Sequence, residues 1–240
     1  MKGKTIIKYF IIILLILIFV IIGYKFTNNK IQEEILRKEL INLVNKDLYK
    51  DNYNLKIKTK GEHARTEKKL KKHYKELSSN IKIINSYLNN QDLINILSLD
   101  NIKNNAPNFE NSYIFIDNVK DKLNTSLSIV INLSSEETIK EILDDKEMDY
   151  IKNDLKKLDN INEETQIMVD NLNTFLDKVE VILNLLKNNS NNWYIEDNEL
   201  YFKTNKLVNE YNNMYNDLNA FVKDKFSKYN KITKTTLKTM

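Results

Sequence analysis

The stretch LKKHYKELSSNIKIINSYL (70–88) carries the pattern that decides the fold class. Its apolar residues are spaced alternately by four and three positions, at Leu70, Tyr74, Leu77, Ile81, Ile84 and Leu88. On a helix of 3.6 residues per turn, this spacing gathers the apolar side chains into one stripe. Because such a stripe has to be buried against another element, the sequence predicts helices that pack side by side.

The same spacing recurs three times further along the chain. It is followed by Met168, Leu172, Phe175, Val179, Ile182 and Leu186, by Leu207, Tyr211, Met214, Leu218 and Phe221, and more loosely by Ile116, Val119, Leu123, Leu127 and Val130. Stripes of similar length predict an antiparallel helical bundle with helices about 25–30 Å long. A sustained coiled-coil dimer is the alternative, but intervening turns divide the chain into short helices and favour the bundle.

Helix starts are predicted where Ser or Thr precedes Glu by three residues, because each side chain can then cap a backbone amide near the other. Ser134 precedes Glu137 with this spacing, and Thr59 precedes Glu62. Asn108 is a third expected cap, since Asn accepts hydrogen bonds from free amides at a helix start.

The stretch WYIEDNELYF (193–202) departs from helical spacing and predicts a β-hairpin. A two-residue turn at 197–198 gives the following pairs: Trp193 with Phe202, Tyr194 with Tyr201, and Ile195 with Leu200. The two tyrosines then share one face and the other four residues share the opposite face. We expect this apolar face to cover one end of the bundle; a platform for a ligand is the alternative reading of the aromatic residues.

The stretch YFIIILLILIFVIIGY (9–24) is uncharged and almost wholly aliphatic. As a helix it covers about 24 Å, slightly less than a hydrocarbon core of about 30 Å, and residues 5–26 together close the gap. Residues 5–26 are therefore predicted to be a transmembrane helix in contact with membrane lipid. A cleaved signal peptide is the alternative. Because Gly23 is the only small residue near the end of the run, we favour an uncleaved anchor.

Basic residues flank the apolar run on both sides. They are Lys2, Lys4 and Lys8 before it, and Lys25, Lys30, Arg37 and Lys38 after it. This balance means that the positive-inside rule does not decide the orientation. A short basic tail before an apolar run is the arrangement of a signal-anchor. We therefore expect a single-pass protein of the cell membrane, with a cytoplasmic N-terminus and an extracytoplasmic C-terminal domain.

The composition disfavours several functional classes. With 3 glycines and 1 proline, Gly-rich phosphate loops are not expected, and the lack of cysteine excludes thiolate metal sites and cysteine nucleophiles. Four of the 37 basic residues lie within residues 1–26, which leaves 33 against the 33 acidic residues of the chain. Because this remainder is neutral, we expect no nucleic-acid partner.

Both histidines lie in KTKGEHARTEKKLKKHY (58–74). His63 precedes Glu67 by four residues, so we expect a hydrogen bond between them near the core, whereas His73 stands among lysines and is expected in solvent. A metal site needs three or four ligands, and no third partner is evident. The stretch is therefore interpreted as a helix start at which Gly61 allows another segment to approach. No catalytic, cofactor-binding or metal-binding residue is predicted, and no cofactor.

These observations divide the chain into four predicted parts. They are a basic tail and transmembrane anchor (1–26), a juxtamembrane helix and connector (27–57), the helical bundle domain (58–226) and a basic flexible tail (227–240). In the second part, Leu36, Leu40 and Leu43 form a shorter stripe on a helix expected to continue the anchor to about residue 50.

Four stretches together resemble a family of membrane-anchored helical proteins of low-GC Gram-positive bacteria. They are GEHARTEKKLKKHY (61–74), NILSLDNIKNNAPNFENS (95–112), LSSEETI (133–139) and WYIEDNELYF (193–202). The resemblance covers residues 61–202. It implies an anchor and an exported helical domain, and no known activity or catalytic residue.

The leading functional expectation is an interaction or scaffold module of the bacterial cell envelope, with an envelope protein or a wall polymer as partner and without catalytic activity. A ligand-sensing bundle with an apolar pocket in its core is one alternative. An envelope-polymer hydrolase is another, acting through paired carboxylates such as Glu136 and Glu137 or Asp144 and Asp145. Such a pair needs one partner removed from solvent.

Overall fold

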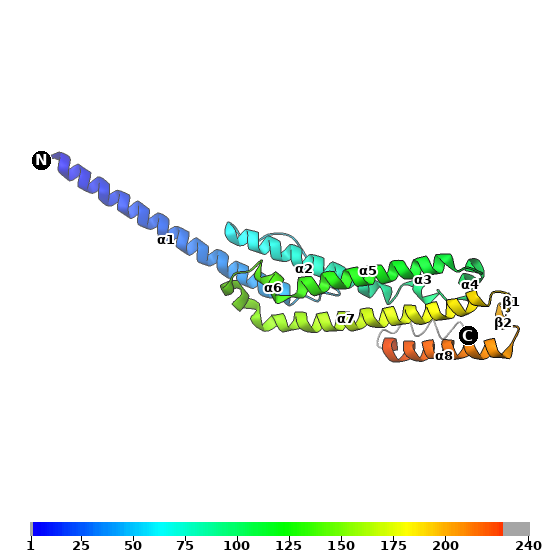
Figure 1. Ribbon diagram of the computed structural model, residues 1–240. Coiled ribbons are helices and arrows are strands. Elements are labelled where there is room, and N and C mark those ends of the chain that lie inside the picture. Colours follow the sequence, from blue (N-terminus) through cyan, green and yellow to red (C-terminus); the bar gives the residue numbers. More distant parts are fainter. Residues whose placement is uncertain (1, 228–240) are drawn as a thin grey trace. The chain divides into compact units, whose positions relative to one another are not determined.

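The computed structural model describes residues 2–227, and the side chains of residues 14–227 other than Asp154. Figure 1 shows the helical elements and a single two-stranded hairpin in this range, which confirms the predicted mainly α fold class. The elements are α1 (Lys2–Val44), α2 (Glu62–Tyr87), α3 (Gln91–Ile94), α4 (Leu99–Asn105), α5 (Glu110–Ser134), α6 (Glu136–Lys140), α7 (Asp145–Asn188), β1 (Trp193–Glu196), β2 (Glu199–Phe202) and α8 (Asn205–Phe226). Apart from Ser227, the expected C-terminal tail lies outside the described residues.

The described residues form two compact units. The first comprises the chain up to Lys75 together with Glu136–Lys156, and the second comprises Glu76–Ser135 and the chain from Lys157 onward. Helices α2 and α7 each contribute residues to both units. The domain limits expected from the sequence stay a prediction.

In the first unit, α1 runs without a break from its apolar stretch into the folded part. The three leucines of the predicted short stripe, Leu36, Leu40 and Leu43, are 0%, 1% and 5% exposed. The helix ends at Val44 rather than near residue 50. A turn follows there, because the Asp47 carboxylate accepts hydrogen bonds from the amides of Tyr49 and Lys50.

Helix α2 begins beside α1 and runs in the same direction. Its His63 ring lies 3.2 Å from the Asn29 amide oxygen, and its Lys71 ammonium lies 2.9 Å from the Glu39 carboxylate. Residues further along α1 therefore contact residues further along α2, as parallel helices require. The intervening residues 45–61 must lead the chain back along α1 before α2 can start.

In the second unit, α5 and α7 are antiparallel neighbours. Three side-chain hydrogen bonds join them: Tyr113 to Asn184 at 2.7 Å, Lys120 to Glu180 at 3.0 Å and Asn173 to Asn124 at 3.0 Å. The partner positions on α5 rise as those on α7 fall, which fixes the antiparallel direction. Helix α8 joins them through the Lys178–Asp217 ion pair and an edge contact between Phe175 and Phe226.

The apolar stripes form the core, as predicted. Every stripe residue of 70–88 and 168–186 is at most 6% exposed. The stripe of α8 is less covered, because Leu207 and Leu218 are buried but Tyr211, Met214 and Phe221 are half-buried.

Helix α7 is much longer than expected. Its 44 residues cover about 66 Å at 1.5 Å per residue, where about 25–30 Å was predicted. The stretch 145–188 contains no glycine or proline that would end a helix. Its polar part near residue 160 therefore continues the helix instead of forming a turn.

The hairpin has the predicted register, with Trp193 opposite Phe202 and Ile195 opposite Leu200. Both turn residues have positive φ, 50° at Asp197 and 60° at Asn198, as a two-residue hairpin turn requires. The Trp193 indole donates a 2.7 Å hydrogen bond to the Leu186 carbonyl near the end of α7. The half-buried face of the hairpin is thus attached to the helical part of its unit.

The predicted helix caps are wrong at all three positions. The Thr59 hydroxyl donates to Glu67 at 2.7 Å instead of capping with Glu62. Ser134 is the last residue of α5, and its hydroxyl donates back to the Ile131 carbonyl. The residue that precedes α5 is Phe109, not Asn108, and it makes no side-chain cap.

The reciprocal cap lies instead at the start of α7. The Asp144 carboxylate accepts from the Glu147 amide at 2.8 Å, and the Glu147 carboxylate accepts from the Asp144 amide at 3.1 Å. The start of α2 depends on Gly61, whose φ of +65° favours glycine. A Cβ there would meet nothing within 4 Å, so the expected close approach of another segment is not observed.

Candidate functional site

Helix α1 carries an exposed apolar surface before it enters the first unit. Over Leu14–Val44 it is long and apolar enough to cross a membrane, and none of its most apolar window is buried. Side chains such as Phe19 and Val20 are 73% and 61% exposed. This surface is consistent with a single-pass membrane anchor.

The carboxylates considered for catalysis do not form a desolvated pair. Glu136, Glu137, Asp144 and Asp145 are all exposed. Glu136 forms an ion pair with Lys140 at 2.7 Å, which lowers the pKa of its carboxyl. The Asp144 carboxylate caps α7. These contacts give two of the four carboxylates structural partners.

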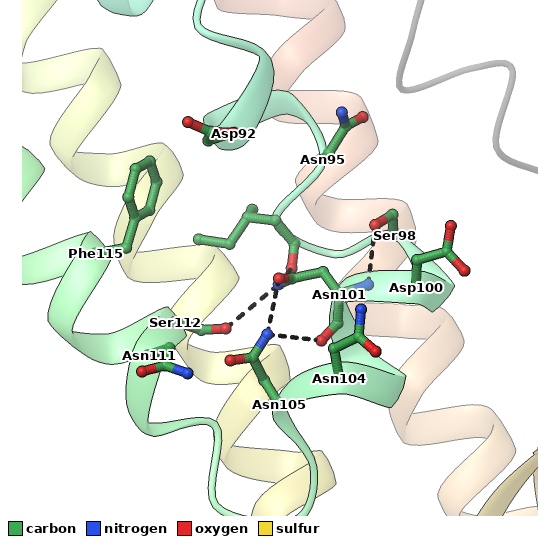
Figure 2. A pocket seen from close by; sticks show the side chains of 11 residues that line it. Asp92, Asn95, Ser98, Asp100, Asn101, Asn104, Asn105, Asn111, Ser112 and Phe115 are labelled. Atoms are coloured by element: carbon green, nitrogen blue, oxygen red, sulfur yellow. Dashed lines mark hydrogen bonds between the residues drawn. The ribbon is translucent and has the colours of Figure 1, made fainter.

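A polar hollow of about 630 Å³ lies in the second unit where α3, α4 and α5 meet (Figure 2). Both short helices begin at a side-chain cap. The Asn90 side chain accepts from the Leu93 amide at 3.0 Å, and the Ser98 hydroxyl accepts from the Asn101 amide at 3.3 Å. Leu93 is 1% exposed. Caps and buried anchors thus hold two helices that are too short to be stable alone.

The floor of this polar hollow is a connected set of side chains. The Asn101 amide group donates to the Ile96 carbonyl at 2.6 Å and to the Ser112 hydroxyl at 3.3 Å. The Asn105 amide group donates to the side-chain oxygen of Asn101 at 2.9 Å. Because these bonds tie α4 to α5 and to the segment before it, the floor is fixed before any ligand arrives.

The rim of the polar hollow is exposed and carries five polar side chains. These are Asp92, Asn95, Asp100, Asn104 and Asn111. The half-buried ring of Phe115 forms one wall and stands near Asp92 in Figure 2. Among the described residues, no lysine or arginine lines the hollow. Its surface is therefore rich in neutral amides, with two carboxylates.

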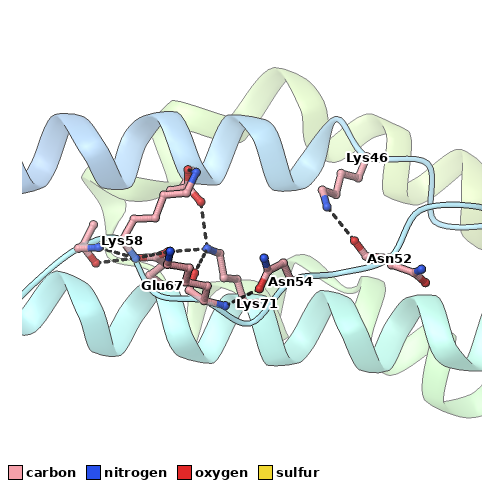
Figure 3. A network of polar contacts seen from close by, with 9 residues as sticks. Lys46, Asn52, Asn54, Lys58, Glu67 and Lys71 are labelled. Atoms are coloured by element: carbon pink, nitrogen blue, oxygen red, sulfur yellow. Dashed lines mark hydrogen bonds and ion pairs between the residues drawn. The ribbon is translucent and has the colours of Figure 1, made fainter.

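A second cluster, in the first unit, is a buried ion network (Figure 3). The Glu67 carboxylate is 1% exposed and accepts from the Lys58 and Thr59 amides at 3.0 and 2.8 Å. The Lys71 ammonium donates to Glu67 at 2.5 Å, to Glu39 at 2.9 Å and to the Lys56 carbonyl at 2.7 Å. All three ammonium hydrogens of Lys71 thus have acceptors.

This network keeps both buried groups charged. Burial raises the pKa of Glu67, but the hydrogen bonds from Lys71 and Thr59 outweigh it and leave that pKa below its ordinary value. Burial lowers the pKa of Lys71, and its two carboxylate partners more than reverse that effect. Because Glu67 and Lys71 are bonded to the connector and Lys71 also to Glu39, the network holds residues 56–59 between α1 and α2.

A hollow of about 350 Å³ adjoins the network and is lined by four lysines. Three of them are engaged by protein groups. Lys46 donates to the Asn52 carbonyl at 2.9 Å, Lys58 pairs with Glu39 at 2.6 Å, and Lys71 is in the network. Because most of its lysines already bond to protein groups, this hollow has fewer side chains available for a ligand than the polar hollow.

The two histidines differ from their expected environments. His63 is near Asn29 rather than bonded to Glu67, because residues 58–59 and Lys71 occupy the Glu67 carboxylate. His73 is 6% exposed instead of solvated, and its ring lies 5.7 Å from that of Tyr74. The two imidazoles stand ten residues apart on α2, and His63 pairs with an amide.

Sequence reasoning missed both the polar hollow and the ion network. The signal for the hollow was the density of Asn, Asp and Ser between residues 89 and 112, which an Asn-rich chain conceals. Comparison of the chain with models of known families, with curated proteins and with solved structures found no match.

Proposed function

We propose that the protein is a membrane-anchored binding module of the bacterial cell envelope. The observation that carries this proposal is the continuity of α1. The same helix exposes Phe19 and Val20 to its surroundings and buries Leu36 and Leu40 in the first unit. Such a helix holds a folded module at a fixed distance from the bilayer.

The proposed topology is a cytoplasmic N-terminus with residues 27–240 outside the membrane. It is supported by the short basic tail before the apolar run. The resemblance of residues 61–202 to anchored helical proteins of low-GC Gram-positive bacteria supports the same location. The partner would then be an envelope protein or a wall polymer.

Binding is favoured over catalysis because the polar hollow presents mainly amides, which do not transfer protons at neutral pH, and because its two carboxylates, Asp92 and Asp100, are exposed rather than removed from solvent. The core-ligand alternative has less support. A hollow beside Phe175 and Leu218 holds only about 20 Å³, room for about one water. The polar hollow in the second unit is therefore the proposed binding site.

Membrane location is tested by fractionating cells that produce the full-length protein with a C-terminal epitope tag. We expect the protein to remain in the membrane pellet after alkaline carbonate extraction. A variant that lacks residues 2–26 should be soluble, whereas the matched control that lacks residues 228–240 should stay in the pellet. Full-length protein in the soluble fraction would refute the anchor.

Orientation is tested by adding protease to intact cells freed of their wall. The proposed topology predicts that the C-terminal tag is lost without lysis, while a cytoplasmic marker protein survives. A tag that is digested only after lysis would place residues 27–240 in the cytoplasm and contradict the envelope role.

A further inference from the structure

The polar hollow between α3, α4 and α5 has a surface chemistry that selects among ligand classes. Asp92 and Asp100 stand on its rim, and no lysine or arginine is among its described lining residues. A phosphate or carboxylate ligand would meet like charge without a cation to pair with it. Anionic ligands are therefore disfavoured.

The rim amides favour a ligand that both donates and accepts hydrogen bonds. The side chains of Asn95, Asn104 and Asn111 are exposed, and each amide carries a donor and an acceptor end. A sugar hydroxyl also does both, so neighbouring hydroxyls can bond to the two ends of one amide. Carboxylates such as Asp92 accept from further hydroxyls.

Phe115 supplies the apolar surface that a sugar ring needs. Its half-buried ring stands on α5 at one wall of the hollow, as Figure 2 shows. The C–H face of a pyranose can pack on such a ring while its hydroxyls face the rim amides. The fixed Asn101–Asn105–Ser112 floor lowers the entropy that binding would cost.

We infer that the polar hollow binds a neutral saccharide segment, with N-acetylated hexosamine units as the best match. The acetamido group adds another donor and acceptor for the amides and a methyl group for Phe115. The volume of about 630 Å³ lies within the range of about 300–1,000 Å³ that small-molecule sites occupy. This inference rests on the proposed binding function and names the ligand class for it.

The test is calorimetric titration of the full-length protein in lipid nanodiscs, which avoids detergents with sugar headgroups. The probes are the tetrasaccharide of N-acetylglucosamine, the tetrasaccharide of glucosamine, and poly(glycerol phosphate). We expect the N-acetylated probe to bind with a dissociation constant below about 1 mM and poly(glycerol phosphate) not to bind. Empty nanodiscs provide the blank.

The variant N104A/N111A removes two exposed rim amides and should weaken binding of the N-acetylated probe at least tenfold. Asn118→Ala is the matched control, because Asn118 is exposed on the same face of α5 two turns beyond Asn111 and does not line the hollow. It should leave the affinity within about twofold. Thermal unfolding is measured for both variants to show that they fold.

Three results would overturn the inference. They are no binding of the N-acetylated probe at about 10 mM, equal binding by wild type and N104A/N111A, and binding of only the amine-bearing or the anionic probe. None of these results bears on carbonate extraction. If the protein pellets with membranes but binds no saccharide, the anchor is supported and the saccharide proposal is refuted. If the protein is soluble but binds the saccharide, the anchor is refuted and the saccharide proposal is supported.

Discussion

The Nζ atom of Lys71 lies 2.5 Å from the Oε1 atom of Glu67, and these side chains are 6% and 1% exposed. The two residues are one helical turn apart on α2, and the connector at residues 56–59 covers them. Replacing both residues of such a buried ion pair by apolar residues changes the stability of a protein little. Removing one partner is strongly destabilising, because it leaves an uncompensated buried charge.

Substitution Glu67→Gln should therefore destabilise the first unit by about 3 kcal/mol, because Lys71 stays buried with less negative charge around it. Hydrogen exchange of the α2 amides in the full-length protein measures this loss. Glu62→Gln is the control, since Glu62 is an exposed acid at the start of the same helix and should change stability by less than about 0.5 kcal/mol. Equal exchange in both variants would show that the network is dispensable.

The same pair predicts a pH dependence. The folded state holds the pKa of Glu67 below its ordinary value of 4.5, so its stabilisation is complete above that pH and is lost as the pH falls through the folded value. Burial raises the pKa of Glu147, so that group acts in the opposite sense. The comparison of wild type with Glu67→Gln isolates the contribution of Glu67, because Glu147 is present in both proteins. Their difference in stability should be large at pH 7 and shrink toward pH 3; a constant difference would contradict it.

The reciprocal cap at the start of α7 predicts unequal effects of two neighbouring substitutions. Asp144→Ala should cost about 1 kcal/mol, because the Glu147 amide loses its acceptor. Asp145→Ala changes an equally exposed acid that makes no cap and should cost less than about 0.5 kcal/mol. Hydrogen exchange over residues 145–150 distinguishes them. Similar losses in both would refute the cap.

The hairpin turn predicts a strong residue preference at position 198. Asn198→Val should destabilise the hairpin by about 1–2 kcal/mol, since a β-branched residue resists a φ of 60°. Glu196→Val provides the control, because Glu196 is exposed on β1 where Val is favoured. Exchange rates of the β1 and β2 amides report the change. A tolerated Val at 198 would mean that the turn has another geometry.

The elements that could be predicted from the sequence are those in which neighbours along the chain decide the outcome. The spacing from Leu70 to Leu88 identified a buried stripe. The Asp197–Asn198 pair identified the hairpin register, because only a few residue types tolerate positive φ at both turn positions. Both patterns depend on local geometry alone.

The helix caps show how a local pattern can select the wrong residue. The Ser134–Glu137 and Thr59–Glu62 pairs have the correct spacing, and so do Asp144 and Glu147. Both predicted helix starts are observed, since α2 begins at Glu62 and α6 at Glu136, but spacing alone does not show which side chain caps a start, because contacts elsewhere decide it. Thr59, for example, donates to Glu67 once the connector has folded back.

The candidate sites depend on contacts that no local pattern contains. His73 was expected in solvent because lysines surround it in sequence, yet both His73 and the neighbouring Lys71 are buried in the structure. The polar hollow joins residues from three helices, so Asn104 and Asn111 come together only when α4 lies on α5. These sites therefore required the structure.

The unbroken course of α1 has a consequence for the direction in which the first unit faces. The helix has no break between the apolar stretch and Leu36, so in a bilayer the first unit tilts together with the helix. A transmembrane helix leans further in a thin bilayer than in a thick one. Lipid composition would thus steer the angle at which the module meets its surroundings.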